Sequence, residues 1–332
     1  MRLLVTGGAG FMGSNFIRFI LSKHKEYEVV NLDKLTYAGN LDNLKDIEGN
    51  PRYTFVKGDI ADPKIVAEVV PGVDAILNYA AETHVDRSIM WARDFAITDV
   101  IGTLTLLEAV NTYKIPVMVQ ISTDEVFGST EKGVFTEESP FLPNSPYSAS
   151  KAGGDLMCRA FLKTYSTPVI VTHSVNFYGP YQYPEKVIPL FVTNLIEGKK
   201  VPLYGKGLNR RQWIYTEDHC RAVDVILHKG VAGKVYNITT GDEISNIELT
   251  KQILGELGKD ETSIEYVKDR PGHDFRYALT IDRLRDLGWS PETSFTEGVK
   301  KTVSWYRDNE WWWKKLKDAK YQEYYSKQYT ER

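Results

Sequence analysis

The chain has 332 residues, of which 42% are hydrophobic and 26% are charged, and its formal net charge is −3. This length exceeds the roughly 100–200 residues of one typical domain, and the composition is that of a globular protein, which excludes a disordered or membrane-embedded chain. No long run of one charge sign occurs in the sequence. A nucleic-acid-binding surface is therefore not expected.

Two further features bear on location and metal binding. The only cysteines, Cys158 and Cys220, are far apart in the sequence, which offers neither a disulfide framework nor a zinc site. The opening MRLLVTGGAGF contains an apolar stretch that is too short for a signal peptide or a membrane span. We therefore predict a cytoplasmic protein that binds no metal, no membrane and no nucleic acid.

The first half of the chain alternates apolar, β-branched segments with intervals long enough for a helix. In chain order these segments are LLVTG, YEVVNLD, RYTFVKGDI, AILNYAA, VMVQISTDE and PVIVTHSV. Strands spaced in this way predict βαβ units around a parallel sheet that helices cover on both faces. Helices are expected over about 13–24, 87–113 and 147–165, the last with Ser145 as its cap and Pro146 in its first turn.

The pattern changes after Tyr178. Prolines punctuate 178–205, and short strands and helices follow, which indicates a smaller lobe over the C-terminal edge of the sheet. We predict a Rossmann-type doubly wound α/β fold, with an NAD-binding domain in 1–177 and a mainly nucleotide-sugar-binding lobe in 178–332 that allows chain crossings back to the first domain. Residues 303–332 are expected to form a helix that packs on the surface through Trp311 to Trp313, or else to contact a partner or fray.

Three glycines mark a candidate cofactor site. Gly7, Gly10 and Gly13 follow the first expected strand and precede a helix, where they permit a tight turn and the close approach of a pyrophosphate to the helix N-terminus. Such a turn can also be purely structural. Asp33 ends the second expected strand, about 20 residues further on, where a carboxylate binds ribose hydroxyls and disfavours a 2′-phosphate. This pattern predicts NAD and not NADP, although the neighbouring Lys34 weakens that choice.

A candidate catalytic set follows. Tyr147 and Lys151 are four residues apart on an expected helix and so share one face. A neighbouring ammonium favours the phenolate, which makes the tyrosine a base near neutral pH; the alternative is an exposed pair. Thr123, Asp124 and Glu125 follow the fifth strand at the carboxyl edge of the sheet, where adjacent carboxyl groups can acquire different pKa values. The alternative there is a solvated turn.

Eight motifs spread over residues 7–279 give the chain a family resemblance. They are GGAGFMGS, NLDKLTYAGNLDNL, AAETHVDRSI, STDEVFG, SPYSASKAGGD, YGPYQYPEKVIP, LYGKGLNRRQW and DRPGHDFRYA. Together they resemble the dTDP-glucose 4,6-dehydratases of the extended short-chain dehydrogenase/reductase family. The glycine turn and the Tyr147–Lys151 spacing are general to that family, and the Thr123-Asp124-Glu125 triplet is the specific mark.

The resemblance implies a reaction and a role for each residue of the set. Tyr147 would take the proton of the sugar 4-hydroxyl, with Thr123 bonded to the same oxygen, while NAD accepts the hydride. Glu125 would remove the C5 proton, and Asp124, which must start protonated, would protonate the departing 6-hydroxyl. Hydride return to C6 would then give a 4-keto-6-deoxy sugar and regenerate the bound NAD. Lys151 would hold the nicotinamide ribose.

The predicted binding residues form two sets. Beyond Tyr147 and Lys151, the predicted cofactor contacts are Gly7, Gly10, Phe11, Met12, Gly13, Asp33, Lys34, Leu35, Thr36, Asp59, Ile60, Tyr79, Ala80, Ala81, Glu82, Thr98 and Asn176. Beyond Thr123, the predicted nucleotide-sugar contacts are Thr83, His84, Phe177, Lys186, Val187, Pro202, Leu203, Tyr204, Arg211, Asn246, Arg270 and His273. The cations among them suit a diphosphate. His84 and His273 lack metal-ligand spacing and are not expected to bind a metal.

The chain departs from the family pattern at a few positions. Phe127 stands where a tyrosine is usual, Phe177 follows Asn176 where a second asparagine is usual, and Arg210 and Gln212 flank Arg211 where other residue types are usual. These departures leave open the preferred nucleotide, with UDP-glucose as the alternative to dTDP-glucose.

Two other functions remain as alternatives. A nucleotide-sugar 4-epimerase or a decarboxylase of the same fold would share the glycines, Tyr147 and Lys151, but would need neither Asp124 nor Glu125. A non-catalytic NAD sensor should have lost one of these four side chains, and all are present. The resemblance also implies a homodimer, formed through helices at about 87–113 and 151–165.

Overall fold

The computed structural model describes residues 1–269 and 274–326. Its centre is a seven-stranded sheet of order β10-β6-β5-β4-β1-β2-β3 in which every neighbouring pair is parallel. The strands are β1 (Arg2–Thr6), β2 (Glu28–Asp33), β3 (Tyr53–Lys57), β4 (Ala75–Asn78), β5 (Val117–Thr123), β6 (Val169–Ser174) and β10 (Val235–Ile238). The predicted doubly wound parallel sheet is confirmed.

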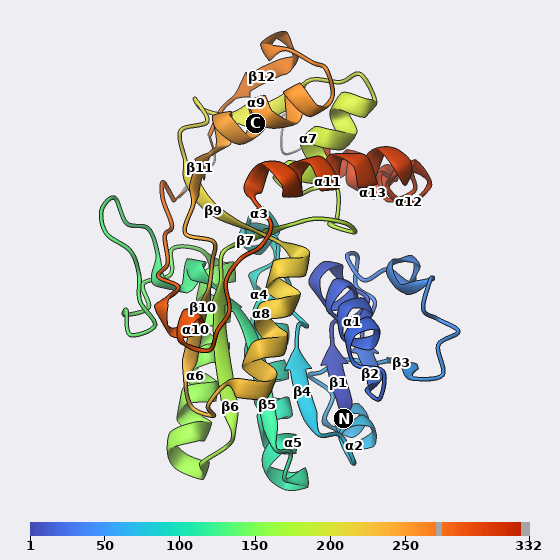
Figure 1. Cartoon of the computed structure of the whole chain (residues 1–332), viewed down its shortest axis with the longest axis vertical. Helices are drawn as coiled ribbons and strands as arrows, with labels where there is room; N and C mark the ends of the chain where they lie inside the picture. Colours follow the sequence, from blue (N-terminus) through green and yellow to red (C-terminus); the bar gives the residue numbers. More distant parts are fainter. Residues whose placement is uncertain (270–273, 327–332) are drawn as a thin grey trace.

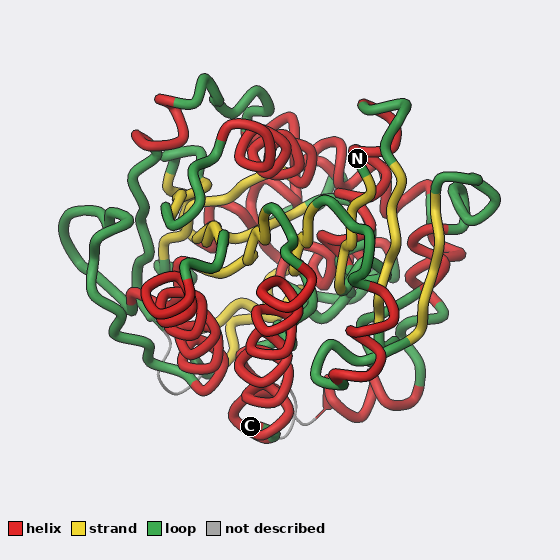
Figure 2. Tube along the Cα trace, turned by 90° about the horizontal axis from the view of Figure 1, so that it is seen from below, coloured by secondary structure: helices red, strands yellow, loops and turns green. Residues whose placement is uncertain are grey.

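Helices cover both faces of this sheet, and Figure 2 shows the strands as a middle layer between them. Leu3 and Val5 of β1 belong to the core on one face, whereas Leu4 between them belongs to the core on the other. The first core includes residues of α1 (Phe11–Lys23) and α8 (Thr216–Lys229), and the second includes residues of α2 (Pro63–Val69), α5 (Thr103–Tyr113) and α6 (Pro146–Tyr165). Burial on both sides explains the nearly continuous apolar strands.

The third predicted helix begins one residue earlier than expected. Pro146 is the first residue of α6, and Ser145 and Ser148 form a reciprocal capping box in front of it. This arrangement satisfies backbone N–H groups that have no partner within the first turn. The cap fixes where the helix starts and therefore where Tyr147 and Lys151 lie.

The prediction of one helix over 87–113 was wrong. The segment consists of α3 (Val85–Met90), α4 (Ala92–Ala96), a π-helical stretch η2 (Ile97–Gly102) and α5. Trp91 separates the first two, because its φ of −136° and ψ of 55° lie outside the helical region. The π-helical stretch changes the direction of the side chains that follow Ala96, which the simple helical period did not anticipate.

A smaller lobe lies above the carboxyl ends of the strands (Figure 1). It contains a three-stranded sheet of order β11-β9-β7 and a pair formed by β12 and β8. Its elements are β7 (Asn176–Tyr178), β8 (Val201–Tyr204), β9 (Arg210–Tyr215), β11 (Glu243–Ser245), β12 (Ile264–Val267), α7 (Val187–Ile196), α9 (Asn246–Glu256), α11 (Phe295–Asp308), α12 (Glu310–Lys314) and α13 (Ala319–Tyr325). The chain crosses back between the lobes, because α8, β10 and α10 (Asp282–Asp286) pack in the large unit.

The aromatic tail is more deeply integrated than the predicted surface helix. Trp312 and Trp313 are fully buried in the core of the smaller lobe, whereas Trp311 is exposed. The indole of Trp312 donates to Asn43 Oδ1 at 2.8 Å, and that of Trp313 donates to the backbone oxygen of Tyr306 at 2.8 Å. The expected single helix is divided into α11, α12 and α13 in the described part of the tail, which packs on the protein through Trp312 and Trp313 but not through Trp311.

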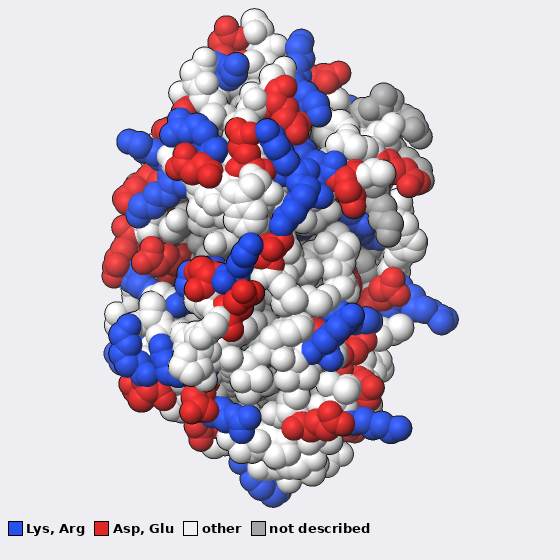
Figure 3. Space-filling view, turned by 90° about the vertical axis from the view of Figure 1, so that its right-hand side faces the viewer, with Lys and Arg blue, Asp and Glu red and all other residues white. Residues whose placement is uncertain are grey.

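The surface carries charges of both signs. On the face in Figure 3, Lys and Arg side chains are interspersed with Asp and Glu side chains. Within residues 1–269 and 274–326, no helix is both long enough and apolar enough to cross a membrane.

Candidate active site

One pocket lies where the smaller lobe meets the carboxyl ends of the strands. Loops that follow β1 to β6 line it, and Trp312 of α12 lines it as well. Among the predicted residues, its lining includes Gly7, Gly10, Phe11, Met12, Gly13, Asp33, Lys34, Thr36, Asp59, Ile60, Tyr79, Ala80, Ala81, Glu82, Thr83, Thr98, Thr123, Asp124, Glu125, Tyr147, Lys151, Asn176, Phe177, Lys186 and Val187. The structure thus brings the catalytic candidates, most of the expected cofactor set and part of the expected nucleotide-sugar set to one place.

The glycine turn is shaped for close backbone approach. Gly7 has a φ of +66°, and a Cβ built there would lie 2.6 Å from the backbone of Ala80. A Cβ at Gly13 would lie 2.4 Å from the oxygen of Gly7. Both positions therefore require glycine, and helix α1 begins directly after the turn at Phe11. Phe11 and Met12 at its N-terminus line the pocket, an arrangement that suits an anion.

Asp33 lies at the end of β2 and connects this turn with the next loop. Its Oδ2 accepts from the amide of Ala9 at 2.9 Å and its Oδ1 from the amide of Leu35 at 2.7 Å. Burial raises its pKa, and these two hydrogen bonds oppose the rise. Lys34 pairs with Asp59 at 2.7 Å, so its ammonium is partly neutralised by a carboxylate of the same pocket. Leu35 itself is not part of the pocket lining in the described structure, and its backbone amide is what supports Asp33.

The catalytic candidates come from β5 and α6. Thr123 is the last residue of β5 and caps the short helix η3 (Asp124–Phe127) by accepting from the amide of Glu125 at 3.3 Å. Its hydroxyl lies 3.2 Å from Asp124 Oδ1 and also bonds Tyr147. Strand end and helix face thus converge on one group of side chains, as their positions in the sequence predict.

Asp124 is held as a carboxylic acid. Burial raises its pKa to about 8, and the charge of Glu125 adds to the rise, while Arg211 and Thr123 oppose it. Its Oδ2 is buried and accepts no hydrogen bond from a described residue. At neutral pH Asp124 therefore carries a proton that it can donate, beside a second carboxyl group.

Tyr147 does not show the expected direction of pKa change. Burial raises its pKa well above the usual value, and the charges of Glu125 and Asp99 raise it further. The ammonium of Lys151 donates to the backbone oxygen of Ile121 at 2.9 Å and lies 3.9 Å from Asp99 Oδ1. The four-residue spacing correctly predicted that both side chains share one buried face of α6. It could not predict the pKa of Tyr147, because the nearby carboxylates come from other parts of the chain.

The predicted nucleotide-sugar contacts divide into three groups. Thr83, Phe177, Lys186 and Val187 line the pocket together with Thr123. His84, Pro202, Leu203, Tyr204, Arg211 and Asn246 do not belong to its described lining. Arg270 and His273 lie outside the described residues.

The position of Arg211 shows why it does not reach the described lining. Its guanidinium stacks on the ring of Tyr277 at 4.3 Å and donates to the backbone oxygens of Arg210, Asp274 and Phe275. Its charge nevertheless acts on Asp124. Arg211 therefore lies close to the catalytic acids while its N–H groups are used by the backbone.

Sequence reasoning missed a second group of pocket residues. Tyr37, Tyr183, Glu185, Trp312 and Leu316 also line the pocket. Glu185 lies within YGPYQYPEK, where only Lys186 was selected, and the proline-rich context could have drawn attention to it. Trp312 follows no recognisable site pattern, because its role depends on a contact with Asn43 across most of the chain.

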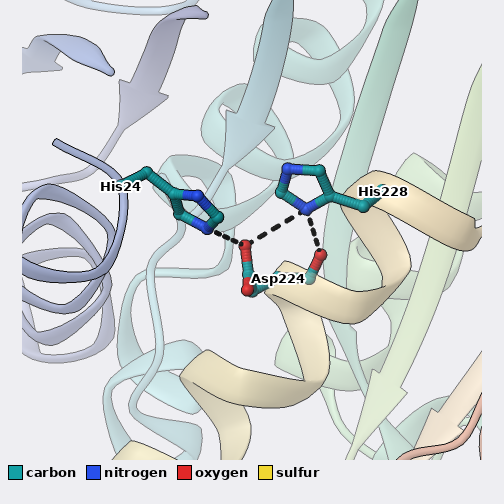
Figure 4. Close-up of side chains that lie close together, drawn as sticks. All are labelled: His24, Asp224 and His228. Atoms are coloured by element: carbon teal, nitrogen blue, oxygen red, sulfur yellow. Dashed lines mark hydrogen bonds and ion pairs between the residues drawn. The ribbon is translucent and has the colours of Figure 1, made fainter. Parts of the chain in front are cut away.

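Figure 4 shows a separate cluster in which two imidazoles approach one carboxylate. His24 Nε2 lies 2.9 Å from Asp224 Oδ1, and His228 Nδ1 lies 2.7 Å from the Asp224 backbone oxygen. Lys23 pairs with the other carboxylate oxygen at 2.8 Å, and Tyr27 bonds the second nitrogen of His228. These contacts join the end of α1 to α8 as a hydrogen-bonded brace. None of these residues lines the pocket.

Comparison with known proteins gives a consistent result. The family model described as GDP-mannose 4,6 dehydratase matches residues 4–302. A dTDP-glucose 4,6-dehydratase of Streptomyces niveus is 52% identical over 96% of this chain and 96% of its own. The low-salt glycan biosynthesis protein Agl12 of Haloferax volcanii is 49% identical over 92% of this chain and 98% of its own.

A solved structure extends the similarity to three dimensions. DesIV, a dTDP-glucose 4,6-dehydratase of Streptomyces venezuelae with NAD bound, has a TM-score of 0.93 and 51% identity over 95% of this chain and 100% of its own. The acid pair after β5 and the Tyr147–Lys151 pair on α6 lie in one pocket of the same fold. The chain belongs to the dTDP-glucose 4,6-dehydratases of the extended short-chain dehydrogenase/reductase family.

Proposed function

We propose that the protein is an NAD-dependent lyase that converts dTDP-glucose into dTDP-4-keto-6-deoxyglucose and water. The observation that carries this proposal is the acid pair at the end of β5. Asp124 is a buried acid with a pKa of about 8, and Glu125 follows it in the same pocket as Tyr147 and Lys151. Such a pair supplies one proton donor and one base, which elimination of water across C5 and C6 requires.

The residues present fit NAD. Gly7 and Gly13 leave no room for a Cβ and so form a cradle for a pyrophosphate beside the start of α1. Asp33 would hold the adenosine ribose, Asp59 and Ile60 the adenine, and Lys151 the nicotinamide ribose. When bound, NAD supplies the reversible acceptance of a hydride. The pairing of Lys34 with Asp59 leaves that lysine less able to attract a 2′-phosphate, which favours NAD over NADP.

The protein side chains then manage the protons. Tyr147, whose hydroxyl bonds Thr123, would take the proton of the sugar 4-hydroxyl, and Thr123 would bond the same oxygen. The resulting ketone at C4 acidifies C5–H, because the carbanion delocalises into the carbonyl group. Glu125 removes this proton, and Asp124 gives its own to the departing 6-hydroxyl. The raised pKa of Asp124 is what keeps that proton available at neutral pH.

We assign the substrate to the lobe that residues 178–332 mainly form, with Phe177, Lys186 and Val187 in contact with it, because these three side chains line the pocket. Arg211, Arg270 and His273 stay predictions for the diphosphate. The cytoplasmic location also stays a prediction; Cys158 and Cys220 are both buried and free.

A homodimer is part of the same proposal. The segments proposed to pair are η2 with α5 and the helix α6, which pack on each other. Ile97, Ile101 and Leu156 on these segments are exposed apolar side chains, at 39%, 47% and 52% of their full surface. Exposed apolar residues on elements that pack together suit an interface. Replacing Leu156 with Asp should therefore produce monomers in light scattering.

The first test is incubation of the purified protein with dTDP-glucose and, separately, UDP-glucose, followed by mass analysis. Loss of one water from the dTDP compound supports the proposal. Loss from UDP-glucose alone would keep the reaction and reassign the nucleotide, in line with the departures at Phe177 and Arg210. An unchanged mass with an inverted sugar configuration would instead make the protein an epimerase, and an unchanged compound with bound NAD would make it a sensor.

A further inference from the structure

A cluster of metal-ligand side chains lies outside the pocket, where the end of α1 meets α8 (Figure 4). Asp224 and His228 are four residues apart on α8 and so share one face of that helix. His24 follows the last residue of α1 and is 200 positions away from Asp224. The sequence prediction of no bound metal was based on the cysteines and on His84 and His273, because His24 meets the other two residues only in the folded chain.

The ligand atoms of the three residues converge. His24 Nε2 lies 2.9 Å from Asp224 Oδ1, and His228 Nδ1 lies 3.2 Å from the same oxygen. All three ligand atoms lie within 4.8 Å of one another. A tetrahedral zinc ion, with bonds of about 2.0–2.2 Å, places its ligand atoms roughly 3.3–3.6 Å apart. The cluster is therefore close to the ligand spacing of zinc, and small rotations of the two imidazoles would complete it.

The types of ligand atom select a class of ion. Two imidazoles and one carboxylate are ligands that zinc binds in proteins, whereas calcium and magnesium prefer oxygen atoms alone. The side chains of His24 and His228 are 21% and 33% exposed, so solvent reaches the cluster and can supply a fourth ligand. Three protein ligands and one water make a complete tetrahedral shell.

Neighbouring side chains orient two of the ligands. Lys23 pairs with Asp224 Oδ2 at 2.8 Å, which leaves Oδ1 directed at the imidazoles. Tyr27 Oη lies 2.7 Å from His228 Nε2 and so holds the ring from its other side. Outer contacts of this kind fix the orientation of the ligands in metal sites. The cluster therefore has the supporting contacts of a metal site in addition to the ligands.

One hydrogen bond competes with an ion at His228. Its Nδ1 lies 2.7 Å from the backbone oxygen of Asp224 and donates to that oxygen when the proton is on Nδ1. In the other tautomer Nε2 carries the proton and donates it to Tyr27 Oη, and the lone pair of Nδ1 is then available to a metal. The same residues thus form a hydrogen-bonded brace without an ion and a ligand set with one.

We propose that His24, Asp224 and His228 bind one zinc ion, which links the end of α1 to α8. The ion has a structural role, because both helices pack on the same face of the large sheet and α1 starts at the glycine turn. The inference does not depend on the proposed dehydratase reaction, since none of the three residues lines the pocket.

The test uses the full-length holoenzyme without a polyhistidine tag, treated with a chelator and freed of unbound nucleotide. Calorimetric titration with zinc chloride should give one bound zinc ion per chain, and the thermal midpoint should rise with added zinc because the ion binds the folded state. Cobalt(II) should occupy the same place and give the visible absorption of a tetrahedral site. Absence of saturable binding, or binding without a rise of the midpoint, would overturn the inference.

Three variants assign the binding to the cluster. His24→Gln and His228→Gln each keep a polar side chain but remove a ligand, so each should weaken zinc binding by more than about 100-fold, since the loss of an outer contact alone costs about 10–100-fold. Glu26→Gln is the matched control, because it removes an exposed carboxylate of the same segment and no ligand, and it should change the affinity only a few-fold. If one histidine variant does not fold, the other decides. Equal binding by the wild type and a folded histidine variant, or an equal loss in Glu26→Gln, would overturn the inference.

Discussion

Two parts of the pocket shift the pKa of a buried carboxyl group in opposite directions. We call the residues that follow β5 the sheet wall and the loop before α7 the loop wall. On the sheet wall, Asp124 is 2% exposed and its pKa is raised to about 8, first by burial and then by Glu125. On the loop wall, Glu185 is 4% exposed; burial acts to raise its pKa, but its neighbours His84, Arg87 and Lys186 and the hydroxyl of Tyr37 lower it. With similar burial, Asp124 is therefore a protonated acid and Glu185 is an anion.

The difference in pKa comes from the charged and hydrogen-bonding partners of each carboxyl group and not from its burial. Arg87 reaches Glu185 at 3.0 Å and Tyr37 donates to it at 2.7 Å. Near Asp124 the guanidinium of Arg211 is committed to backbone oxygens. Asp124 keeps its proton and can donate it in the reaction. Glu185 is paired with Arg87, and this pair joins α3 to the loop before α7. The comparison leads to four predictions, from the largest effect to the smallest.

The largest effect is expected at Glu125 on the sheet wall. Glu125→Gln keeps the shape but removes the C5 base, so turnover should fall by roughly 10²–10⁴-fold. Oxidation at C4 should partly continue, and reduced cofactor should accumulate with absorbance near 340 nm. Tyr147→Phe is the matched control, because it should stop the first hydride transfer and give no such signal. Full turnover of Glu125→Gln would remove this residue from the mechanism.

On the loop wall the expected effect is on stability. Glu185→Gln leaves the half-buried Arg87 without its buried anion, which should destabilise the fold by up to about 3 kcal/mol. Since the pKa of Glu185 is lowered, the advantage of the wild type should be full above the ordinary glutamate value and vanish as pH falls through the folded pKa. Chemical denaturation between pH 3 and 8 measures this difference. Glu138→Gln, which breaks the exposed pair with Arg283, should cost at most about 1 kcal/mol.

Asp124→Asn should show the opposite pH dependence. A raised pKa means that the folded state holds its proton more tightly than the unfolded chain, so wild-type stability declines as pH rises from about 4 toward 8. The variant cannot ionise, and its relative stability should grow by up to about 1.4 kcal/mol per pH unit in that range. Parallel stability curves for the two proteins would show that Asp124 is not held protonated. Turnover should be lost in either case.

The smallest effect is expected at Trp312 of α12, which lines the same pocket. Trp312→Phe removes the hydrogen bond to Asn43, whose amide in turn bonds the backbone oxygen of Ala9 in the glycine turn. We expect a loss of about 1 kcal/mol in unfolding free energy and weaker retention of NAD. Trp311→Phe, at an exposed position, should change neither. Equal behaviour of the two variants would argue against a role of the tail in the site.

The local sequence anticipated much of the site. Alternating strands and helices predicted the parallel sheet, and the glycines, the strand end at Thr123 and the spacing of Tyr147 and Lys151 placed the candidate residues in one pocket. These features could be predicted because each depends on backbone geometry over a few residues: a turn that excludes a Cβ, a helical period, and the shared edge of parallel strands.

What the sequence by itself determined is therefore the fold class, the family and the residue types gathered at the carboxyl edge of the sheet. Only the tertiary structure decided the protonation of those residues, because the pKa of Asp124, Tyr147 and Asp99 depends on burial and on charges far away in the chain. It also decided that 87–113 divides at Trp91 and that Trp312 reaches Asn43. Neither outcome follows from a local pattern, since long-range packing sets both.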